Sequence, residues 1–325
     1  MNLDFSAIKE SKNLLAFSAG VDSCALFFLL LEQNIPFDIA IVNYNVREQS
    51  KEELCYAKEL ANKYNKQIFI KDVKLDNSSN FEKKARDIRY NFFEDLIKNH
   101  NYEVLITAHQ LNDKLEWFMM QLSKGAGLIE LIGLNTWEEK TNYKIYKPLL
   151  DMSKDELLNY LERNQINYFV DESNYDEKYK RNYFRHNFSE RFLNEFKDGI
   201  KNSFKYLEED IKSLDINNKP IFKEKDLEVF ENKNDDNLNI RVIDINLKKR
   251  GILLSNSTRK EILEKKDVVV SHKIAVAIND KFIFISPYFT NNMDKKFKEK
   301  CRIKKIPKNI RAYLFKENID LKFSD

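Results

Sequence analysis

The sequence predicts an α/β protein with a doubly wound, mostly parallel sheet, followed by a smaller α+β C-terminal domain. Two observations predict this architecture. Apolar strand-like runs alternate with helix-like segments through the first half of the chain, and β-α-β repeats of this length build a parallel sheet. After about residue 217, a polar stretch leads into short alternating strands. Because 325 residues are enough for two hydrophobic cores, we place the domains at 1–215 and 216–325.

The first domain is expected to contain four strands, each followed by a helix. β-branched and apolar runs predict the strands, and helical periodicity predicts the helices. In chain order the expected segments are strand 13–17, helix 21–34, strand 37–43, helix 50–65, strand 67–73, helix 80–100 with Asn80 as its cap, strand 104–108 and helix 111–124. Ser153 and Glu156 form a capping-box pattern before a helix that ends near residue 164. A long helix is expected from about 187 to 214.

The second domain is expected to be irregular at first and then α+β. The polar stretch 217–239 is predicted to lack regular structure. The expected elements after it are helices near 240–247 and 257–265 and strands at 268–270, 275–278 and 282–286. A chain that is 42% hydrophobic and 33% charged has the composition of a soluble globular protein. Apolar runs stay below the roughly 18 residues that span a membrane, and the first residues lack a secretory pattern, so we expect a cytoplasmic protein without a membrane partner.

The turn after the first strand carries the most functional information. It reads Ser18-Ala19-Gly20-Val21-Asp22-Ser23 and leads from an apolar strand into an apolar helix. Such a turn binds phosphate through backbone N–H groups, hydroxyls and the helix dipole. The Asp22 carboxylate would repel phosphate unless a divalent metal lies between them, so the run predicts a nucleotide with Mg²⁺. A buried helix capped by Ser or Asp would use the same residue types.

A second polar group follows the fourth strand. The run Thr107-Ala108-His109-Gln110-Leu111-Asn112-Asp113 places His109 and Asp113 four residues apart near a helix start. Because ligands bind outside the carboxyl ends of parallel strands, Ser18 and His109 are expected to face one crevice. There Asp113 can share a metal with Asp22, and His109 can meet a phosphate. A capping Asp beside a solvent-facing His is the alternative interpretation.

Basic side chains are candidates for contact with RNA. Arg86 and Arg89 lie one turn apart on the expected helix 80–100, and Arg181 and Arg185 stand among amides and aromatic residues. The arginine fork binds two phosphate oxygens at once, and aromatic rings stack bases. Between residues 294 and 311 there are nine Lys or Arg against two acids. The residues of this tail that we expect to meet phosphates are Lys304, Lys305 and Lys308. Ordinary solvated faces are the alternative for each group.

Together these motifs resemble the PP-loop ATP pyrophosphatase superfamily. The resemblance rests on Ser-x-Gly-x-Asp-Ser after the first strand and Thr-Ala-His-x-x-x-Asp after the fourth. Further pieces resemble the tRNA(Ile)-lysidine synthase family within it, in the same order over roughly residues 13–190. These pieces are Ala85-Arg86-x-x-Arg89-Tyr90-x-Phe92-Phe93, Lys124-Gly125-Ala126-Gly127-Leu128, Lys147-Pro148-Leu149-Leu150, and Asp171-x-Ser173-Asn174 leading to Arg181-Asn182-x-x-Arg185.

The resemblance implies a ligase that cleaves ATP between its α- and β-phosphates. AMP is placed on the C2 oxygen of the wobble cytidine in the CAU anticodon of tRNA(Ile). Free L-lysine then displaces AMP and forms lysidine, so that AUA is read as isoleucine. In this scheme the residues 18–23 bind ATP, Asp22 and Asp113 hold Mg²⁺, and His109 and Arg86 join them in catalysis. The residues expected to contact the tRNA are Arg89, Arg181, Arg185, Lys304, Lys305 and Lys308.

Some points stay open or depart from the family pattern. Asp171 and Glu172 are candidates to receive the lysine ammonium, and a homodimer is one oligomeric state that the sequence leaves open. Ala19 stands where the family usually has glycine, so we expect Ala19 to adopt a negative φ. Gln110 stands where the family usually has a second histidine, so we expect no role for a second histidine in this chain.

Two other functions compete with this interpretation. A tRNA thiolase shares the loop, but it commonly needs a CxxC pair. The cysteines of this chain are scattered at Cys24, Cys55 and Cys301. A non-catalytic RNA-binding protein with a degenerate loop would be expected to lack Asp22 or Asp113, and both are present.

Overall fold

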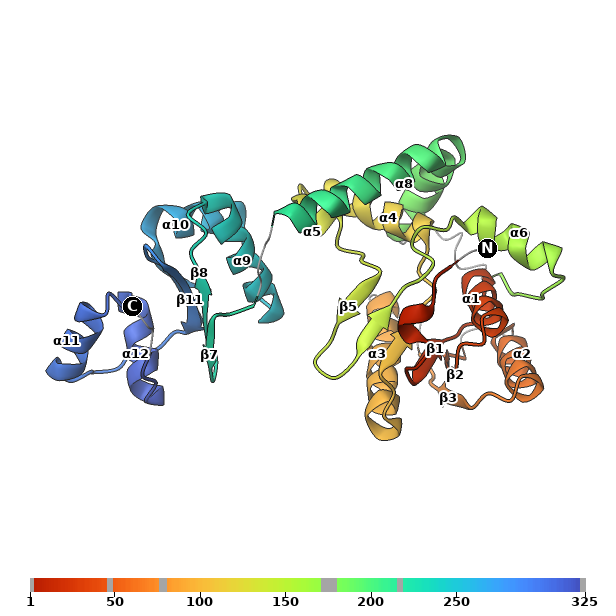
Figure 1. Ribbon diagram of the computed structural model, residues 1–325, viewed down its shortest axis with the longest axis horizontal. Helices are drawn as coiled ribbons and strands as arrows, with labels where there is room; N and C mark the ends of the chain where they lie inside the picture. Colours follow the sequence, from red (N-terminus) through yellow and green to blue (C-terminus); the bar gives the residue numbers. More distant parts are fainter. Residues whose placement is uncertain (1–2, 46–48, 76–80, 171–179, 215–218, 322–325) are drawn as a thin grey trace. The chain divides into compact units, whose positions relative to one another are not determined.

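The computed structural model describes residues 3–45, 49–75, 81–170, 180–214 and 219–321. The chain divides into two compact units, Met1–Asp210 and Ile211–Asp325, and each is described by itself (Figure 1). None of the described helices combines the length and apolar character that crossing a bilayer would require.

Unit 1 is built on a six-stranded sheet with the strand order β3-β2-β1-β4-β6-β5. The strands are β1 (Asn13–Ala16), β2 (Asp38–Asn43), β3 (Ile68–Asp72), β4 (Val104–Ile106), β5 (Trp137–Glu139) and β6 (Lys144–Tyr146). All neighbouring pairs are parallel except the edge pair β5–β6. The predicted doubly wound, mostly parallel sheet is therefore confirmed. The short β5–β6 pair was not predicted, because three-residue strands carry little periodicity.

Helices cover both faces of this sheet. They are α1 (Val21–Glu32), α2 (Gln49–Lys63), α3 (Phe81–His100), α4 (Leu111–Leu122), α5 (Leu128–Leu131), α6 (Lys154–Arg163), α7 (Lys180–Phe184) and α8 (Glu190–Ser213), with a 3₁₀ turn η1 (Ser6–Ile8) before β1. One core joins α1, α2 and α6 to Leu15 and Ile39 of the sheet, and another joins α3 to Leu14 and Leu105 on the opposite face. Successive strand residues thus point into different layers, as the pleat requires. Figure 1 shows α3 apart from α1 and α2.

Two capping predictions have different outcomes. The capping box at α6 is confirmed, because the Ser153 side chain accepts from the Glu156 N–H and the Glu156 carboxylate accepts from the Ser153 N–H. Asn80, the expected cap of α3, lies outside the described residues.

The long helix expected from about 187 to 214 is observed as α8, with a kink inside it at Phe196 (φ −128°, ψ 23°). Helix α7 leads through a π-helical turn, η3 (Arg185–Ser189), into α8. Lys114 of α4 contacts α8. Its buried ammonium lies 2.6 Å from the Glu208 carboxylate and 5.0 Å from the centre of the Phe204 ring, both on α8. The sequence did not predict the π-helical turn before α8 or the kink at Phe196, because helical periodicity alone reveals neither.

Unit 2 is an antiparallel sheet with the order β7-β8-β11-β10-β9 and helices on both faces. Its elements are β7 (Phe222–Glu224), β8 (Leu227–Glu231), α9 (Asp236–Lys249), α10 (Asn256–Lys265), β9 (Asp267–Val270), β10 (Ile274–Ile278), β11 (Phe282–Pro287), α11 (Lys295–Ile303) and α12 (Lys308–Glu317). One core packs α9 and α10 on the sheet, and the other packs α11 and α12 on its reverse. The α+β expectation is confirmed.

The expectation that residues 217–239 are irregular was wrong. This stretch contains β7, β8 and the start of α9. Leu227 and Val229 of β8 are fully buried, whereas Lys223 and Glu228 form an ion pair at 2.8 Å on the other face. Charged residues such as Lys223, Glu224 and Glu228 give this segment a polar average composition, and this concealed the two strands.

Candidate active site

The turn between β1 and α1 forms one wall of the candidate site. The Ser18 N–H donates to Ser23 Oγ at 3.2 Å, and the two serine Oγ atoms lie 3.2 Å apart. Ser23 Oγ also donates to the Gly20 carbonyl at 3.1 Å, and Gly20 is the N-cap of α1. Two hydroxyls therefore lie together at a helix N-terminus, where an anion gains from the dipole.

Ala19 does not have the negative φ that the sequence suggested, because its φ is +58°. The Ala19 carbonyl accepts the Phe169 N–H at 2.9 Å, and Gly20 forms an isolated bridge with Phe169. The chain must reverse from β1 into α1 while keeping this contact, and the turn overrides the preference of alanine. A left-handed conformation costs a non-glycine residue roughly 1–2 kcal/mol. The complete burial of the Ala19 methyl offsets part of this cost.

The second wall follows β4. Strands β1 and β4 are parallel neighbours, with Leu15 opposite Ile106, so Ser18 and His109 leave the same edge of the sheet. His109 precedes the helix rather than lying on it, because Gln110 is the N-cap of α4. Its Nδ1 lies 2.9 Å from Thr107 Oγ1.

Asp22 and Asp113 interact electrostatically across these two walls. Burial, followed by the negative charge of Asp113, raises the pKa of Asp22 to about 7. Burial works in the same direction on Asp113, but Arg181, His109 and the Gln110 N–H together hold the pKa of Asp113 below its usual range. Neighbouring carboxylates that differ in this way share their proton unequally. Asp22 is thus the group that gains most from an added cation.

Arg181 and Arg185 form an ion-pair network with the first turns of α4. Arg181 donates to an oxygen of Asp113 and, at 2.8 Å, to Glu116. Arg185 donates to the other Glu116 oxygen at 2.7 Å. Glu116 is 1% exposed, and its charge is compensated by both arginines. Asp113 also accepts the Gln110 N–H at 3.0 Å, so it caps α4 as well as facing the site.

His109 is surrounded by positive charge. Burial lowers the pKa of His109 to about 4; Arg181, Lys147 and Arg86 act in the same direction, and the charge of Asp113 opposes them. The imidazole is therefore neutral at pH 7 and can donate one hydrogen bond and accept another.

The other two sequence candidates on α3 lie close by. The Arg86 guanidinium lies 4.5 Å from the centre of the Tyr90 ring. Its positive charge contributes to lowering the pKa of His109 and that of Lys147. Burial raises the pKa of Tyr44, and the positive charge of Arg89 opposes this effect. The Tyr44 hydroxyl donates to the Ala85 carbonyl at 2.8 Å. The structure thus brings Arg86 toward the histidine.

Two further cations near the site were not among the sequence candidates. Lys147 is 3% exposed, donates to Glu138 at 3.1 Å and acts on His109. Lys154 stands at the start of α6, where its charge lowers the pKa of Asp22 against the effect of burial. Lys147 lies in the motif Lys147-Pro148-Leu149-Leu150 that carries part of the family resemblance, and this was the available signal.

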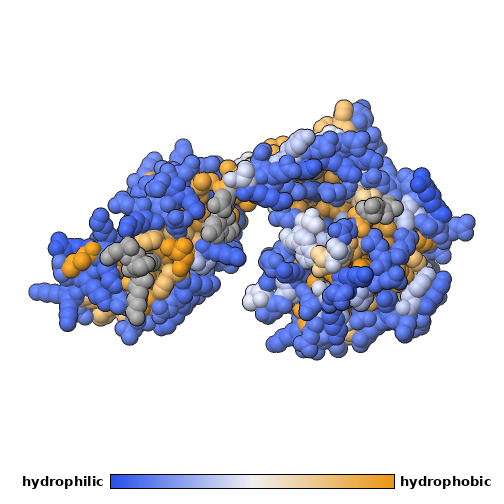
Figure 2. Space-filling view, in the orientation of Figure 1, coloured by the Kyte–Doolittle hydropathy of each residue, from blue (hydrophilic) through white to orange (hydrophobic). Residues whose placement is uncertain are grey.

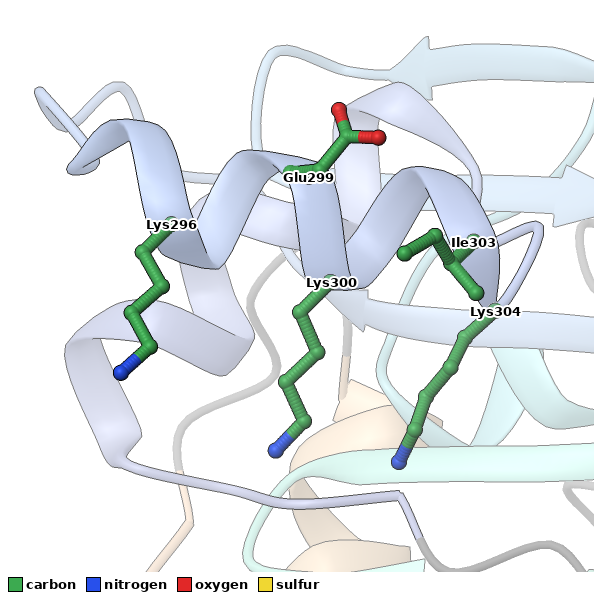
Figure 3. Close-up of a pocket in the computed structure, with 5 residues that line it drawn as sticks. All are labelled: Lys296, Glu299, Lys300, Ile303 and Lys304. Carbon is green, nitrogen blue, oxygen red and sulfur yellow. The ribbon is translucent and has the colours of Figure 1, made fainter.

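The basic tail of unit 2 forms a ridge along α11. Lys296, Lys300 and Lys304 project side by side and border a hollow of about 460 Å³ with Glu299 and Ile303 (Figure 3). Both Lys300 and Lys304 contact the Asp320 carboxylate at 3.1 Å. Of the other two expected lysines, Lys305 lies 3.9 Å from Asp280, and Lys308 is exposed at the start of α12.

The described residues contain no group of three or more His, Cys, Asp or Glu side chains placed to hold a metal ion. Among the described residues, the candidates for holding a metal ion at this site are the carboxylates of Asp22 and Asp113. Asp22 Oδ1 is buried without a hydrogen-bond partner, as a carboxylate would be if it awaited a cation. Asp171 and Glu172 lie outside the described residues.

The fold and the site define a PP-loop nucleotide-binding protein, and a PP-loop domain model matches residues 2–192. The chain is 48% identical to a tRNA(Ile)-lysidine synthase of Campylobacter jejuni, over 97% of this chain and 95% of that protein. It is 43% identical to the tRNA(Ile)-lysidine synthase of Wolinella succinogenes, over 96% and 95% of the two chains. The chain belongs to the tRNA(Ile)-lysidine synthase family. The resemblance drawn from the sequence is thereby confirmed, together with the classification as a ligase that uses ATP.

A solved structure shares the fold at greater distance. The U34-tRNA thiolase NcsA from Methanococcus maripaludis, solved with its [4Fe-4S] cluster, superposes with a TM-score of 0.53. The two proteins are 19% identical, and the match covers 63% of this chain and 74% of that one. At this identity the likeness supports the fold alone.

Proposed function

We propose that this chain joins lysine to C2 of the wobble cytidine in the CAU anticodon of tRNA(Ile), through an adenylated tRNA intermediate. The product, lysidine, would let the tRNA read AUA as isoleucine. The observation that carries the proposal is the pair Asp22 and Asp113 beside serine hydroxyls and a helix N-terminus. This combination suits ATP phosphates accompanied by a divalent cation. The nearly full-length similarity to tRNA(Ile)-lysidine synthases supports the identity of the tRNA and of lysine.

Residues 18–23 would hold ATP, and Asp22 with Asp113 would hold Mg²⁺. The unpartnered Asp22 Oδ1 supports this assignment. Mg²⁺ usually takes one or two protein carboxylates and completes its shell with phosphate oxygens and water, so two carboxylates suffice. When bound, the ion would neutralise charge on the phosphates.

The first step transfers AMP to the tRNA. The C2 oxygen of the cytidine attacks the α-phosphorus, the bond from that phosphorus to the bridging oxygen breaks, and pyrophosphate leaves. The hydroxyls of Ser18 and Ser23 and the N-terminus of α1 would bind this leaving group. Arg86 would stabilise negative charge on the α-phosphate, and neutral His109 would hydrogen-bond to it. Positioning and charge stabilisation would thus supply most of the rate.

The second step uses free lysine. Its uncharged amine attacks C2, the bond from C2 to the oxygen bearing AMP breaks, and AMP leaves while the amine gives up a proton. Lysine carries an ammonium and a carboxylate, so its pocket needs charges of both signs. Asp171 and Glu172 stay the candidates for the ammonium, and they lie outside the described residues.

The direct test is incubation of the protein with ATP, Mg²⁺, labelled lysine and tRNA(Ile) bearing a CAU anticodon. We expect label in the tRNA, with AMP and pyrophosphate as products. An absence of label under conditions where the tRNA binds would overturn the proposal. Asp22→Ala should abolish turnover while leaving tRNA binding nearly intact. Asp198→Ala, at an exposed position of α8, is the matched control and should behave as the unchanged protein.

The proposal extends to the partners and the compartment. We infer a cytoplasmic enzyme in which residues 1–215 bind ATP and 216–325 add tRNA contacts through Lys304, Lys305 and Lys308. Arg89 would add a contact from the catalytic domain. Arg181 and Arg185 were also expected to contact the tRNA, and in the structure they pair with Asp113 and Glu116. Sedimentation in solution distinguishes a monomer from the homodimer that the sequence left open.

Sulfur transfer is less well supported. Cys24 and Cys301 are buried, and burial raises the pKa of the Cys24 thiol. Cys55 is exposed on α2. A lone exposed thiol does not provide the cysteine pair that a thiolase commonly uses, which favours ligation.

A further inference from the structure

Four aromatic side chains are exposed along α7, η3 and the beginning of α8. Tyr183, Phe188 and Phe192 are each 44% exposed, and Phe196 is 52% exposed. We call them the aromatic stripe. Figure 2 shows light orange atoms standing out from the mostly blue surface over α8. Large apolar rings in water lose the free energy that burial would provide, so a cluster of them marks a contact surface.

The π-helical turn makes these rings one continuous stripe. Tyr183 and Phe188 are five residues apart, a spacing that a regular α-helix would turn onto different faces. Across η3 their ring centres instead lie 5.8 Å apart. Phe188, Phe192 and Phe196 follow at four-residue spacing, and the last two rings are 5.2 Å apart.

The charge around the stripe favours a polyanion as its partner. Residues 180–197 contain five Lys or Arg against two Glu, whereas residues 198–213 contain three Lys against four acids. Arg181 and Arg185 are compensated by carboxylates of α4, so the charge beside the exposed rings comes from Lys180, Arg191 and Lys197 against Glu190 and Glu195. This balance is still more positive than that of residues 198–213. Aromatic rings among basic side chains are the combination that binds unpaired nucleotides.

The stripe is continuous with the candidate active site. Tyr183 lies between Arg181 and Arg185, and both arginines contact Glu116 of α4. Helix α4 starts directly after His109, at the wall of the site. A base held in the site would therefore have its neighbours in the strand close to the first rings of the stripe.

We propose that the aromatic stripe stacks the unpaired bases of the anticodon loop that flank the target cytidine. The identity of the RNA rests on the proposed function, and the stacking itself rests on the exposed rings and the local charge. Stacking on a protein ring contributes about 1–3 kcal/mol per base and is tolerant of base identity. The stripe would thus hold the loop open without reading its sequence.

The test compares Phe188→Leu/Phe192→Leu with the unchanged protein in binding an RNA hairpin of the anticodon arm. Leucine keeps an apolar side chain and removes the π-face. We expect binding about 10-fold weaker or more, with an unchanged salt dependence, because phosphate contacts are retained. Phe192→Trp should retain affinity, and its fluorescence should be quenched by the hairpin but not by a blunt duplex of the same stem.

Tyr206→Leu is the matched control, since Tyr206 is 62% exposed on α8 beyond the stripe. Unchanged binding by the double variant, or an equal loss with Tyr206→Leu, would overturn the inference. A change from dimer to monomer in the double variant would instead identify an interface between copies and would also overturn it. If the unchanged protein makes lysidine while the double variant binds normally, the stripe fails and the proposed function stands. If lysine is never incorporated while the double variant binds poorly, the proposed function fails and the stripe stands.

Discussion

Replacing Gly20 with alanine separates phosphate binding from the folding of the turn. Gly20 has φ −78° and ψ 170°, which alanine adopts without strain. A Cβ built there would lie 3.5 Å from Ser18 Oγ and 3.9 Å from the Phe169 carbonyl oxygen, which are ordinary van der Waals distances. Alanine is a poorer N-cap than glycine, so we expect a loss of stability of about 1 kcal/mol.

The effect on ATP should be larger. The added methyl would stand at the N-terminus of α1, beside the Ser18 hydroxyl, where a phosphate has to approach. Hydrogen bonds to a charged group contribute about 1.5–3 kcal/mol each. Losing one of them raises the KM for ATP by roughly 10-fold to 100-fold, since each 1.4 kcal/mol is a factor of ten.

The assay is pyrophosphate release as a function of ATP concentration, with thermal unfolding measured on the same preparations. Gly199→Ala is the control, because a Cβ at that position of α8 meets nothing within 4 Å. The control should have the normal KM and equal or higher stability, since alanine is the better helix former. A normal KM for Gly20→Ala would refute the assignment of this turn to phosphate binding. A large loss of stability would show instead that the turn itself had changed.

Three further predictions concern exposure and charge. A thiol reagent should label Cys55 in the native protein and the two buried cysteines after unfolding; rapid labelling of all three would contradict the described burial. His109 should titrate near pH 4 by NMR without ATP. As the pH falls, His109 is protonated in the unfolded chain before it is protonated in the folded protein. The folded protein therefore loses stability between about pH 6.5 and pH 4. A titration midpoint near 6.5 would show that His109 is not buried. Replacing Lys304, Lys305 and Lys308 by alanine should weaken tRNA binding and reduce its salt dependence; an unchanged slope would make this an ordinary surface.

Local patterns predicted the parallel sheet and the two walls of the site. Each strand and helix of the first four β-α units has its own periodicity, so its approximate position could be inferred from the sequence. The topology of such units then places Ser18 and His109 at the carboxyl ends of strands, which turned out to be neighbours. The sequence therefore allowed the prediction that Ser18 and His109 lie at the same edge of the sheet.

Features that depend on distant partners were not accessible in this way. Arg181 lies 68 residues from Asp113 and 65 from Glu116, and no local pattern specifies those ion pairs. The positive φ of Ala19 depends on a hydrogen bond from Phe169, 150 residues away in the chain. In both cases tertiary contacts override what the isolated residue prefers.

The charge balance of the site differs between Asp22 and Asp113. The carboxylates of Asp113 and Glu116 face two arginines, so that network is close to neutral. Asp22 has one oxygen without a hydrogen-bond partner, and its pKa is raised by burial and by Asp113. Two nearby carboxylates ionise together only when positive charge compensates both. With ATP and Mg²⁺ bound, Asp22 would gain a compensating positive charge, and Arg181 would gain the phosphates as an alternative partner to Asp113. The arginine network would then hold the ATP-free site together and release a cation toward the nucleotide when it binds.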